Sequence, residues 1–317
     1  MSFLENNLEN KKVAILYGGV SDEREVSLAS GQNAYDALSA SGVDVELIDT
    51  RDGREALRRL ADGNYAVAFI ALHGKGGEDG TIQGALEMLQ IPYTGSGVAA
   101  SATAMDKSRS KAMYALAGLA VARSVTLASP MAMSVEEIAQ AVGDKCVVKP
   151  CGDGSSVGMS IVHTPAELPH ALEVAFACGQ KVMVEEYVAG TEVTVAVLGN
   201  DDPEPLPVIE IVPHAEFYDY EVKYSANGAD HIIPARLEAD VYERVQTAAV
   251  QAHKALGCRG VSRSDFIIRD DGTPVILETN TIPGMTATSL LPDTARKVGM
   301  DFGQVCLKLL ELALEGR

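Results

Sequence analysis

Residues 262–280 of this chain read SRSDFIIRDDGTPVILETN. Two short apolar segments flank Asp271-Gly272, a dipeptide typical of two-residue type I′ hairpin turns. A turn centred there places Asp265 directly opposite Glu278, and Arg263 opposite Asn280. Because side chains alternate along a strand, all four lie on one face of the predicted hairpin.

Opposed carboxylates on a sheet repel each other, so the pair Asp265 and Glu278 calls for a compensating cation. Mg²⁺ typically uses one or two carboxylates together with phosphate oxygens. A solvated polar sheet face is the alternative interpretation. The following segment, residues 281–290, contains Gly284 and four Thr or Ser residues, which suit anion binding by backbone amides and side-chain hydroxyls. The presence of this segment directly after the hairpin favours a metal–phosphate site over a solvated polar face.

Composition limits the class of protein. The 317 residues allow two or three domains, and 47% of them are hydrophobic, as in ordinary globular proteins. A formal charge of −18 argues against a nucleic-acid or anionic-membrane partner. No apolar run approaches the ~18 residues of a membrane span, and the polar first residues resemble neither a signal nor a transit peptide. The five cysteines show no metal-binding spacing, which predicts reduced thiols in a cytoplasmic protein.

The order of predicted elements indicates an α/β protein. Strands and helices alternate over residues 12–100, which predicts a parallel sheet with ligand-binding loops at its carboxyl edge. Asp22 is placed to cap the helix that follows the first strand, with Glu25 three positions on. Residues 104–190 predict a smaller α+β unit, and strands dominate from Glu192 until helices near 239–256 and 302–314.

Several motifs outside the hairpin have two interpretations each. Residues 149–158 are predicted to form a glycine-rich loop between two strands. The loop could bind phosphate, with Lys149 supplying a positive charge, or it could be a plain hairpin. The sequence has no Walker A pattern. The connector around Glu185-Glu186 fits either an adenine-binding strand or an exposed acidic hinge. In isolation, Lys107 reads as an ordinary helix-start lysine and Glu23 as a helix-dipole partner. His73 reads as a loop histidine or as a substrate contact. The aromatic stretch 217–225 predicts an ordered functional loop.

Taken in order, these motifs closely resemble the D-alanine–D-alanine ligases of the ATP-grasp superfamily. The matching segments are GG…EREVS (18–27), ALHG…GEDG (71–80), PYTGSG (92–97), MDK (105–107), VKP…GSSVG (148–158), YDYEVKY (218–224) and ETNT…PGMT (278–286). The resemblance covers nearly the full length. It implies three α/β domains: an N-terminal Rossmann-like parallel sheet over residues 1–100, and two α+β domains over 101–189 and 190–317 that enclose the nucleotide.

The resemblance also implies a reaction. ATP activates one D-alanine carboxylate as an acyl phosphate, and the amine of a second D-alanine attacks it to give the dipeptide used in peptidoglycan synthesis. Expected cofactors are ATP and two Mg²⁺ or Mn²⁺ ions, and a homodimer is expected. Two rivals remain: a relative that joins D-alanine to D-lactate or D-serine, and a non-catalytic nucleotide-binding module. A histidine is typical of depsipeptide-forming relatives at the position of Tyr224, so D-alanine is the favoured acceptor.

Residue roles follow by position from the same resemblance. ATP phosphates should be held by Lys107, Lys149 and Lys223. The adenosine should be bound by Glu185, Glu186, Val188 and Glu192. The metal ions should be bound by Asp265, Glu278 and Asn280. Catalytic groups should be Glu23, Ser155, Tyr224, Arg263 and the backbone amide of Gly284. The two D-alanines should contact Glu23, His73, Ser289 and Leu290.

The chain departs from the family pattern in three places. Residues 151–153 replace the usual tip of the glycine-rich loop, Glu186 stands where lysine is common, and two serines flank Arg263. Lys149 near Cys151 predicts a reactive thiolate. The alternative is that Cys151 is only a small spacer.

Overall fold

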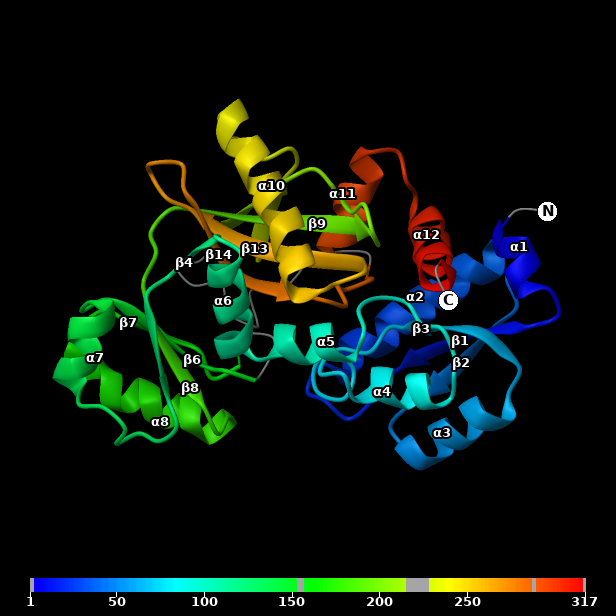
Figure 1. The fold of residues 1–317 in the computed structure, drawn as a ribbon, viewed down its shortest axis with the longest axis horizontal. Helices are drawn as coiled ribbons and strands as arrows, with labels where there is room; N and C mark the ends of the chain where they lie inside the picture. Colours follow the sequence, from blue (N-terminus) through cyan, green and yellow to red (C-terminus); the bar gives the residue numbers. More distant parts are fainter. Residues whose placement is uncertain (1–2, 153–156, 215–227, 287–288, 316–317) are drawn as a thin grey trace.

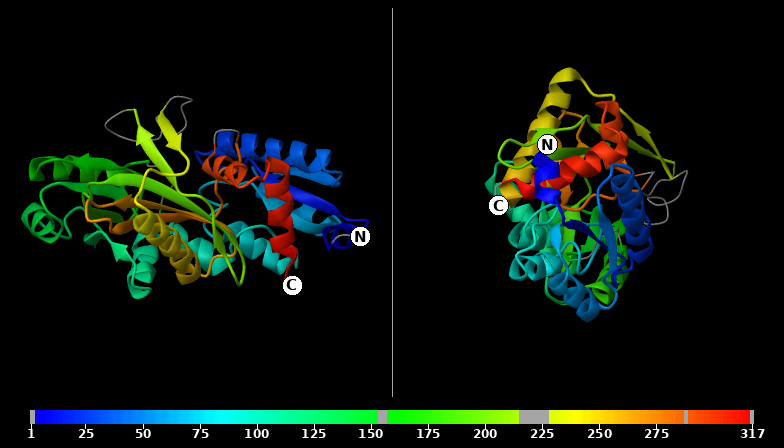
Figure 2. Two further views of the ribbon diagram at one scale, coloured as in Figure 1. Left: turned by 90° about the horizontal axis from the view of Figure 1, so that it is seen from above. Right: turned by 90° about the vertical axis from the view of Figure 1, so that its right-hand side faces the viewer.

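The computed structural model describes residues 3–152, 157–214, 228–286 and 289–315. Three β-sheets follow one another along the long axis of the molecule, with both chain ends near the parallel sheet (Figure 1). The left view of Figure 2 shows the same order from above, and the right view looks along the long axis. The predicted α/β architecture with an N-terminal parallel sheet is confirmed. Among the described residues, no helix is long and apolar enough to cross a membrane.

The parallel sheet has the order β2-β1-β3 and is buried on both faces. Its strands are β1 (Lys12–Tyr17), β2 (Val45–Asp49) and β3 (Tyr65–Ile70). Val13 and Ile15 pack on one side, in a core that includes helices α1 (Phe3–Leu8), α2 (Arg24–Ala40) and α12 (Phe302–Leu314). Ala14 and Leu16 pack on the other, against α3 (Gly53–Asp62) and α4 (Thr81–Met88). Strand alternation explains this division.

The start of α2 differs from the prediction. Glu23, not Asp22, occupies the N-cap position, and its side chain makes no capping hydrogen bond. Arg24 explains the local order instead, because its guanidinium binds both oxygens of Asp49 and the carbonyl of Gly19. The Arg24 guanidinium lowers the pKa of Asp49 to about 2.

The central sheet has seven strands in the order β12-β11-β9-β13-β14-β4, with β10 beside β9. Its strands are β4 (Ala120–Val121), β9 (Thr191–Gly199), β10 (Glu204–Pro205), β11 (Ile209–Pro213), β12 (Ala229–Ile232), β13 (Gly260–Ile268) and β14 (Pro274–Asn280). Phe266, Ile276 and Val195 bury one face in a core with α10 (Ala239–Leu256), α5 (Val98–Met105) and α6 (Lys107–Leu116). The opposite face is mixed: Ala196, Leu198 and Val261 pack in the core shared with the parallel sheet, and Arg263, Asp265 and Glu278 line a cavity. Helix α11 (Leu290–Lys297) follows β14.

The β13–β14 hairpin pairs its carboxylates as predicted but turns differently. Arg269 N donates to the carbonyl of Thr273 at 3.0 Å, so the loop has three residues and ends on Gly272 at φ 75°. Near the turn, Phe266 pairs with Ile276. A β-bulge at Leu277 then shifts the register, so that Asp265 pairs with Glu278 and Arg263 with Asn280.

The third sheet is antiparallel, in the order β5-β8-β6-β7. Its strands are β5 (Ser124–Leu127), β6 (Cys146–Pro150), β7 (Ser160–Val162) and β8 (Val182–Glu186), covered by α7 (Val135–Val142) and α8 (Leu168–Cys178). The glycine-rich segment joins β6 to β7, as predicted. Residues 153–156 of that segment lie outside the described residues. The domain boundaries after residues 100 and 189 stay predictions.

Candidate functional site

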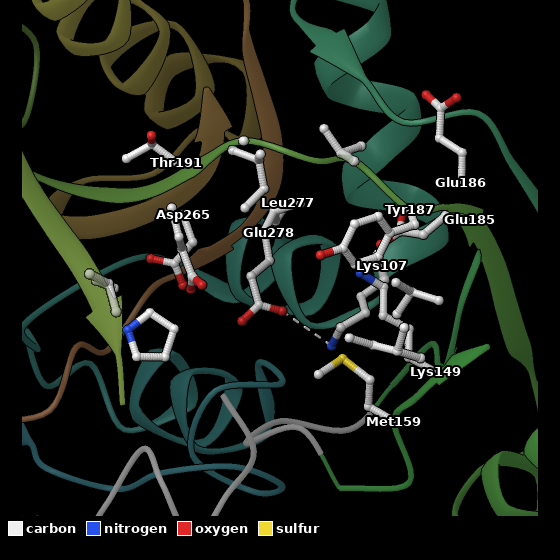
Figure 3. A pocket seen from close by; sticks show the side chains of 18 of the residues that line it. Lys107, Lys149, Met159, Glu185, Glu186, Tyr187, Thr191, Asp265, Leu277 and Glu278 are labelled. Atoms are coloured by element: carbon white, nitrogen blue, oxygen red, sulfur yellow. Dashed lines mark ion pairs between the residues drawn. The ribbon is translucent and has the colours of Figure 1, made fainter. Parts of the chain in front are cut away.

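A cavity of about 470 Å³ lies between the four-stranded and the seven-stranded sheets. β6, β7 and β8 form one wall, and β9, β11, β13 and β14 form the other. Figure 3 shows lysine and carboxylate side chains converging on it. Of the predicted site residues, it is lined by Lys107, Lys149, Glu185, Glu186, Val188, Glu192, Arg263, Asp265, Glu278 and Leu290.

Asp265 and Arg263 stand on the polar face of β13. Because Phe266 is buried in the core on the opposite face, its neighbour Asp265 points into the cavity. The Arg263 guanidinium donates to both oxygens of Asp265, each at 3.1 Å. Thr194 Oγ1 on the adjacent strand donates to Asp265 Oδ1 at 2.5 Å. These contacts fix the carboxylate while leaving it on the cavity wall.

Glu278 reaches the same space from β14. The bulge places Leu277 and Glu278 consecutively on the cavity side, and Lys107 Nζ lies 3.4 Å from Glu278 Oε2 (Figure 3). Lys107 begins α6, whose N-cap Asp106 accepts from the amides of residues 108 and 109. The Lys107 amide donates to the carbonyl of Cys151 at 2.8 Å, so the helix start and the glycine-rich segment are held together.

Lys149 on β6 forms an ion pair with Glu185 on β8, and Lys111 on α6 binds the other carboxylate oxygen at 2.6 Å. Burial alone would raise the pKa of Glu185, but the two lysines outweigh it and hold that pKa below the ordinary value. Lys149 is buried, so its charge is poorly screened by solvent. The cluster concentrates positive charge in an acidic protein.

The end of the cavity near the connector 187–191 is apolar. It is lined by Val147, Met159, Ile161, Tyr187, Val188, Ile267 and Leu277. Glu192 lines the cavity at the start of β9, next to this slot. The Glu186 carboxylate points away from the other labelled side chains in Figure 3 and binds Arg123 at 2.7 Å and Arg269 at 2.8 Å. A flat, apolar slot with a carboxylate at its edge suits a purine nucleoside.

A second polar cluster lies at the carboxyl edge of the parallel sheet. Glu23, His73 and Glu78 are all buried there. His73 Nε2 lies 3.2 Å from Ser30 Oγ, and the ring also hydrogen-bonds the backbone of Ile282. Burial lowers the pKa of His73, which favours a neutral ring. These contacts correspond to the loop-histidine interpretation, and a substrate contact for His73 stays a prediction.

Glu78 belongs to this cluster and was missed as a site residue. Its Oε2 accepts from the Gly74 amide at 2.7 Å. Burial, and then the charge of Glu23, raise the pKa of Glu78 to about 8. The field of Arg263 also reaches Glu78, which connects this cluster electrostatically to the cavity. The sequence signal was the GEDG motif of residues 77–80, whereas the burial of Glu78 is seen only in the structure.

The segment after β14 returns to the parallel sheet. Asn280 Oδ1 accepts from the Ile282 amide at 2.8 Å, and the Met285 amide donates to Ser30 Oγ at 3.3 Å. A Cβ at Gly284 would stand 2.8 Å from Ser289 Oγ, so a larger residue there would displace the Ser289 hydroxyl. Ser289 Oγ also accepts from the Thr286 amide at 3.0 Å. Gly284 and Ser289 are thus neighbours, as a shared binding loop requires.

Three predicted residues, Ser155, Lys223 and Tyr224, lie outside the described residues, and so does the aromatic stretch 217–225. Two further residues that contact predicted site residues were not identified from the sequence. Thr194, which binds Asp265, lies opposite it on β9, and the pairing of these two distant strands could not be read from the sequence. Lys111 stands four residues after Lys107 on one helix, a spacing that puts both on the same face.

The prediction of a reactive Cys151 thiolate is wrong. Cys151 is buried, and burial followed by the charge of Asp106 raises the pKa of its thiol. Three nearby lysines lower that pKa by less. The exposed cysteine is Cys178, at the end of α8.

The donor set fits a hard divalent cation. Within the described part of the chain, no three His, Cys, Asp or Glu side chains gather as a metal-binding group. Asp265 and Glu278 supply two carboxylates on one wall, so further oxygen ligands would come from phosphate and water, which is how Mg²⁺ is commonly held. Lys107 and Lys149 line the same cavity as these carboxylates.

Comparisons with known proteins agree with this geometry. Two family models match, D-ala D-ala ligase N-terminus over residues 49–96 and D-ala D-ala ligase C-terminus over residues 113–311. The D-alanine–D-alanine ligase of Pelotomaculum thermopropionicum is 47% identical, with 96% of this chain and 97% of the relative covered. That of Anaeromyxobacter sp. (strain K) is 50% identical, with 95% and 96% covered.

Solved structures show the same fold. The VanG D-Ala:D-Ser ligase of Enterococcus faecalis superposes with a TM-score of 0.84 at 34% identity, covering 96% of this chain and 100% of that one. The D-alanine–D-alanine ligase of Bacillus anthracis complexed with ATP gives 0.84 at 32% identity, covering 96% and 97%. The predicted ATP-grasp fold is confirmed. The chain belongs to the D-alanine–D-alanine ligase family.

Proposed function

We propose that this protein joins two molecules of D-alanine in a reaction that converts ATP to ADP and phosphate. One observation carries the proposal: two lysines, Lys107 and Lys149, face two carboxylates, Asp265 and Glu278, across a cavity that continues into an apolar slot. A nucleoside triphosphate has the matching parts, a flat base and a chain of anions that bind cations. The names of the relatives support the same activity.

The nucleotide would lie with its base in the apolar slot, between Met159 and Leu277, and its ribose near Glu192. Its phosphates would contact Lys107 and Lys149. Asp265 and Glu278, with Asn280 beside them, would hold Mg²⁺ or Mn²⁺. The bound metal supplies charge neutralisation at the phosphate oxygens. Lys223 is a further phosphate ligand in this proposal.

The amino acids would bind between the cavity and the parallel sheet. Glu23 would bind the ammonium group of the first D-alanine. The carboxylate of this D-alanine would attack the terminal phosphorus of ATP to give an acyl phosphate and ADP. Arg263 would stabilise charge on the transferring phosphoryl group, since phosphoryl transfer depends on positioning and charge neutralisation. Its two hydrogen bonds to Asp265 hold the guanidinium at the cavity wall.

The second D-alanine would bind with its carboxylate at Ser289 and Leu290. Its deprotonated amine would attack the acyl carbon, and phosphate would leave as the peptide bond forms. The backbone amide of Gly284 would donate to the oxygen that becomes negative. Ser155 and Tyr224 would complete a hydrogen-bonded triad with Glu23. The acyl phosphate must be kept from water, so a closed site is needed.

The dipeptide would serve peptidoglycan synthesis. The homodimer, the two-metal stoichiometry and the cytoplasmic location stay predictions. A second acceptor has a specific observation in its favour, because one similar solved structure is a D-Ala:D-Ser ligase. Tyr224 favours D-alanine, and the curated relatives at 47–50% identity are named for D-alanine as acceptor.

The test is product identification. Purified protein is incubated with ATP, Mg²⁺ and D-alanine, alone or with D-serine or D-lactate, and ADP and condensed products are quantified by mass spectrometry. We expect D-alanyl-D-alanine and ADP in equal amounts, with little mixed product. Predominant D-Ala-D-Ser or D-Ala-D-lactate would assign the rival activity, and ATP binding without ADP formation would indicate a non-catalytic module.

A further inference from the structure

Three buried charged side chains form a row that begins in the β6–β8 wall of the cavity and ends on α6. Lys111 Nζ lies 2.6 Å from Glu185 Oε2, and Lys149 binds the other oxygen of the same carboxylate. The side chains of Lys111, Glu185 and Lys149 are 12%, 6% and 9% exposed, so solvent screens them little. Glu185 and Lys149 line the cavity.

The three residues come from different parts of the fold. Lys149 and Glu185 stand on neighbouring strands of the four-stranded sheet, where Val147 pairs with Glu185. Lys111 comes from α6, whose Tyr114 packs in the core of the seven-stranded sheet. The ion pair of Lys111 and Glu185 therefore connects the two sheets behind the phosphate region.

The charges of Lys111, Glu185 and Lys149 do not cancel. Without Lys111, the Glu185 carboxylate would neutralise Lys149 and hold its ammonium away from a phosphate. Lys111 occupies one carboxylate oxygen, so Glu185 shares its charge between two cations and the group carries one net positive charge. Lys149 therefore retains attraction for an anion in the cavity.

We propose that Lys111 is a positioning residue for ATP: by compensating Glu185 from behind, it sets the position and the effective charge of Lys149 toward the nucleotide phosphates. The inference rests on the proposed ATP-dependent function. Both carboxylate oxygens of Glu185 are engaged by lysines, so the predicted adenosine contact of Glu185 would be made by its backbone.

A charge-rescue experiment tests the proposal. Lys111→Met removes the charge and keeps the length of the side chain, and Lys111→Met combined with Glu185→Gln removes both charges. Lys12→Met is the matched control, because Lys12 forms an exposed pair with Glu46 at 3.2 Å, far from the cavity. The readouts are the dissociation constant of a non-hydrolysable ATP analogue by calorimetry, the KM values for ATP and D-alanine, and thermal unfolding.

We expect Lys111→Met to weaken analogue binding and raise the KM for ATP by about tenfold or more, with the KM for D-alanine changed less than about threefold. The double variant should recover most of the ATP affinity, because Lys149 is no longer neutralised. The Lys12→Met control should bind the analogue as the wild type does.

Two results would overturn the proposal: wild-type ATP affinity in Lys111→Met, or a double variant that binds ATP no better than the single one, which would indicate a structural role only. If the single variant does not fold, the double variant and Lys111→Arg decide, since both should bind the analogue within about threefold of wild type. A wild-type protein that neither binds the analogue nor releases ADP would instead refute the proposed function.

Discussion

Replacing Glu278 by glutamine separates stability from catalysis. The substitution preserves the shape of the side chain and removes its charge. The substitution removes the ion pair with Lys107, whose charged atoms are 3.4 Å apart. Because Glu278 is 34% exposed, this pair stabilises the fold by only ~0.2–1 kcal/mol. Relief of the repulsion with Asp265 across the strand pair contributes a similar amount with opposite sign. We therefore expect the free energy of unfolding to change by less than about 1 kcal/mol.

Catalysis should respond far more strongly to Glu278→Gln. An amide is a weak ligand for Mg²⁺, and loss of several kcal/mol of charge stabilisation, taken as about 4, corresponds to a roughly 10³-fold lower turnover. ADP release is measured across a Mg²⁺ titration, with urea unfolding in parallel. Glu46→Gln is the control, because Glu46 is exposed to a similar degree and is paired with Lys12 and Arg59. A folded Glu278→Gln protein that releases ADP within tenfold of wild type at saturating Mg²⁺ would refute the metal assignment.

Two further predictions concern a buried imidazole and the thiols. Burial, and then Lys254, lower the pKa of His253 to about 4, so protonation favours the unfolded chain, whose histidine titrates near 6.5. The stability that His253 contributes above pH ~6.5 should be lost as the pH falls toward 4, by roughly 3 kcal/mol. Urea unfolding of the wild type and of His253→Asn should show a shallower pH dependence in the variant; parallel curves would contradict this. Thiol reagents should modify the exposed Cys178 in the native protein and spare the buried Cys151. Mass spectrometry that finds Cys151 labelled first would count against its burial.

The pairing of the two carboxylates was predicted correctly, although the predicted turn type was wrong. Asp271-Gly272 indicated a two-residue turn, whereas the loop has three residues. The bulge at Leu277 compensates for the difference, and the predicted pairing of Asp265 with Glu278 is confirmed. Turn residues report local dihedral angles only, so a bulge several residues away, which depends on packing against neighbouring strands, leaves no clear mark in the sequence.

Tertiary contacts explain what else the sequence could not supply. A helix was predicted near 302–314, and the structure has α12 there, but the local sequence does not say that Leu309 packs in one core with Phe69 of the parallel sheet. Asp22 was predicted to cap α2. In the structure Glu23 is the N-cap residue, and the next residue, Arg24, forms an ion pair with Asp49. Lys107 was found by motif, and its neighbour on the same helix face, Lys111, was not.

The central claim is that Asp265 and Glu278 hold metal ions against the nucleotide phosphates. Anomalous diffraction from crystals grown with Mn²⁺ and a non-hydrolysable ATP analogue measures this directly. The account predicts Mn²⁺ peaks in contact with both carboxylates, with the base in the apolar slot and the phosphates at Lys107 and Lys149. Mn²⁺ bound away from both carboxylates, or a nucleotide outside this cavity, would contradict it.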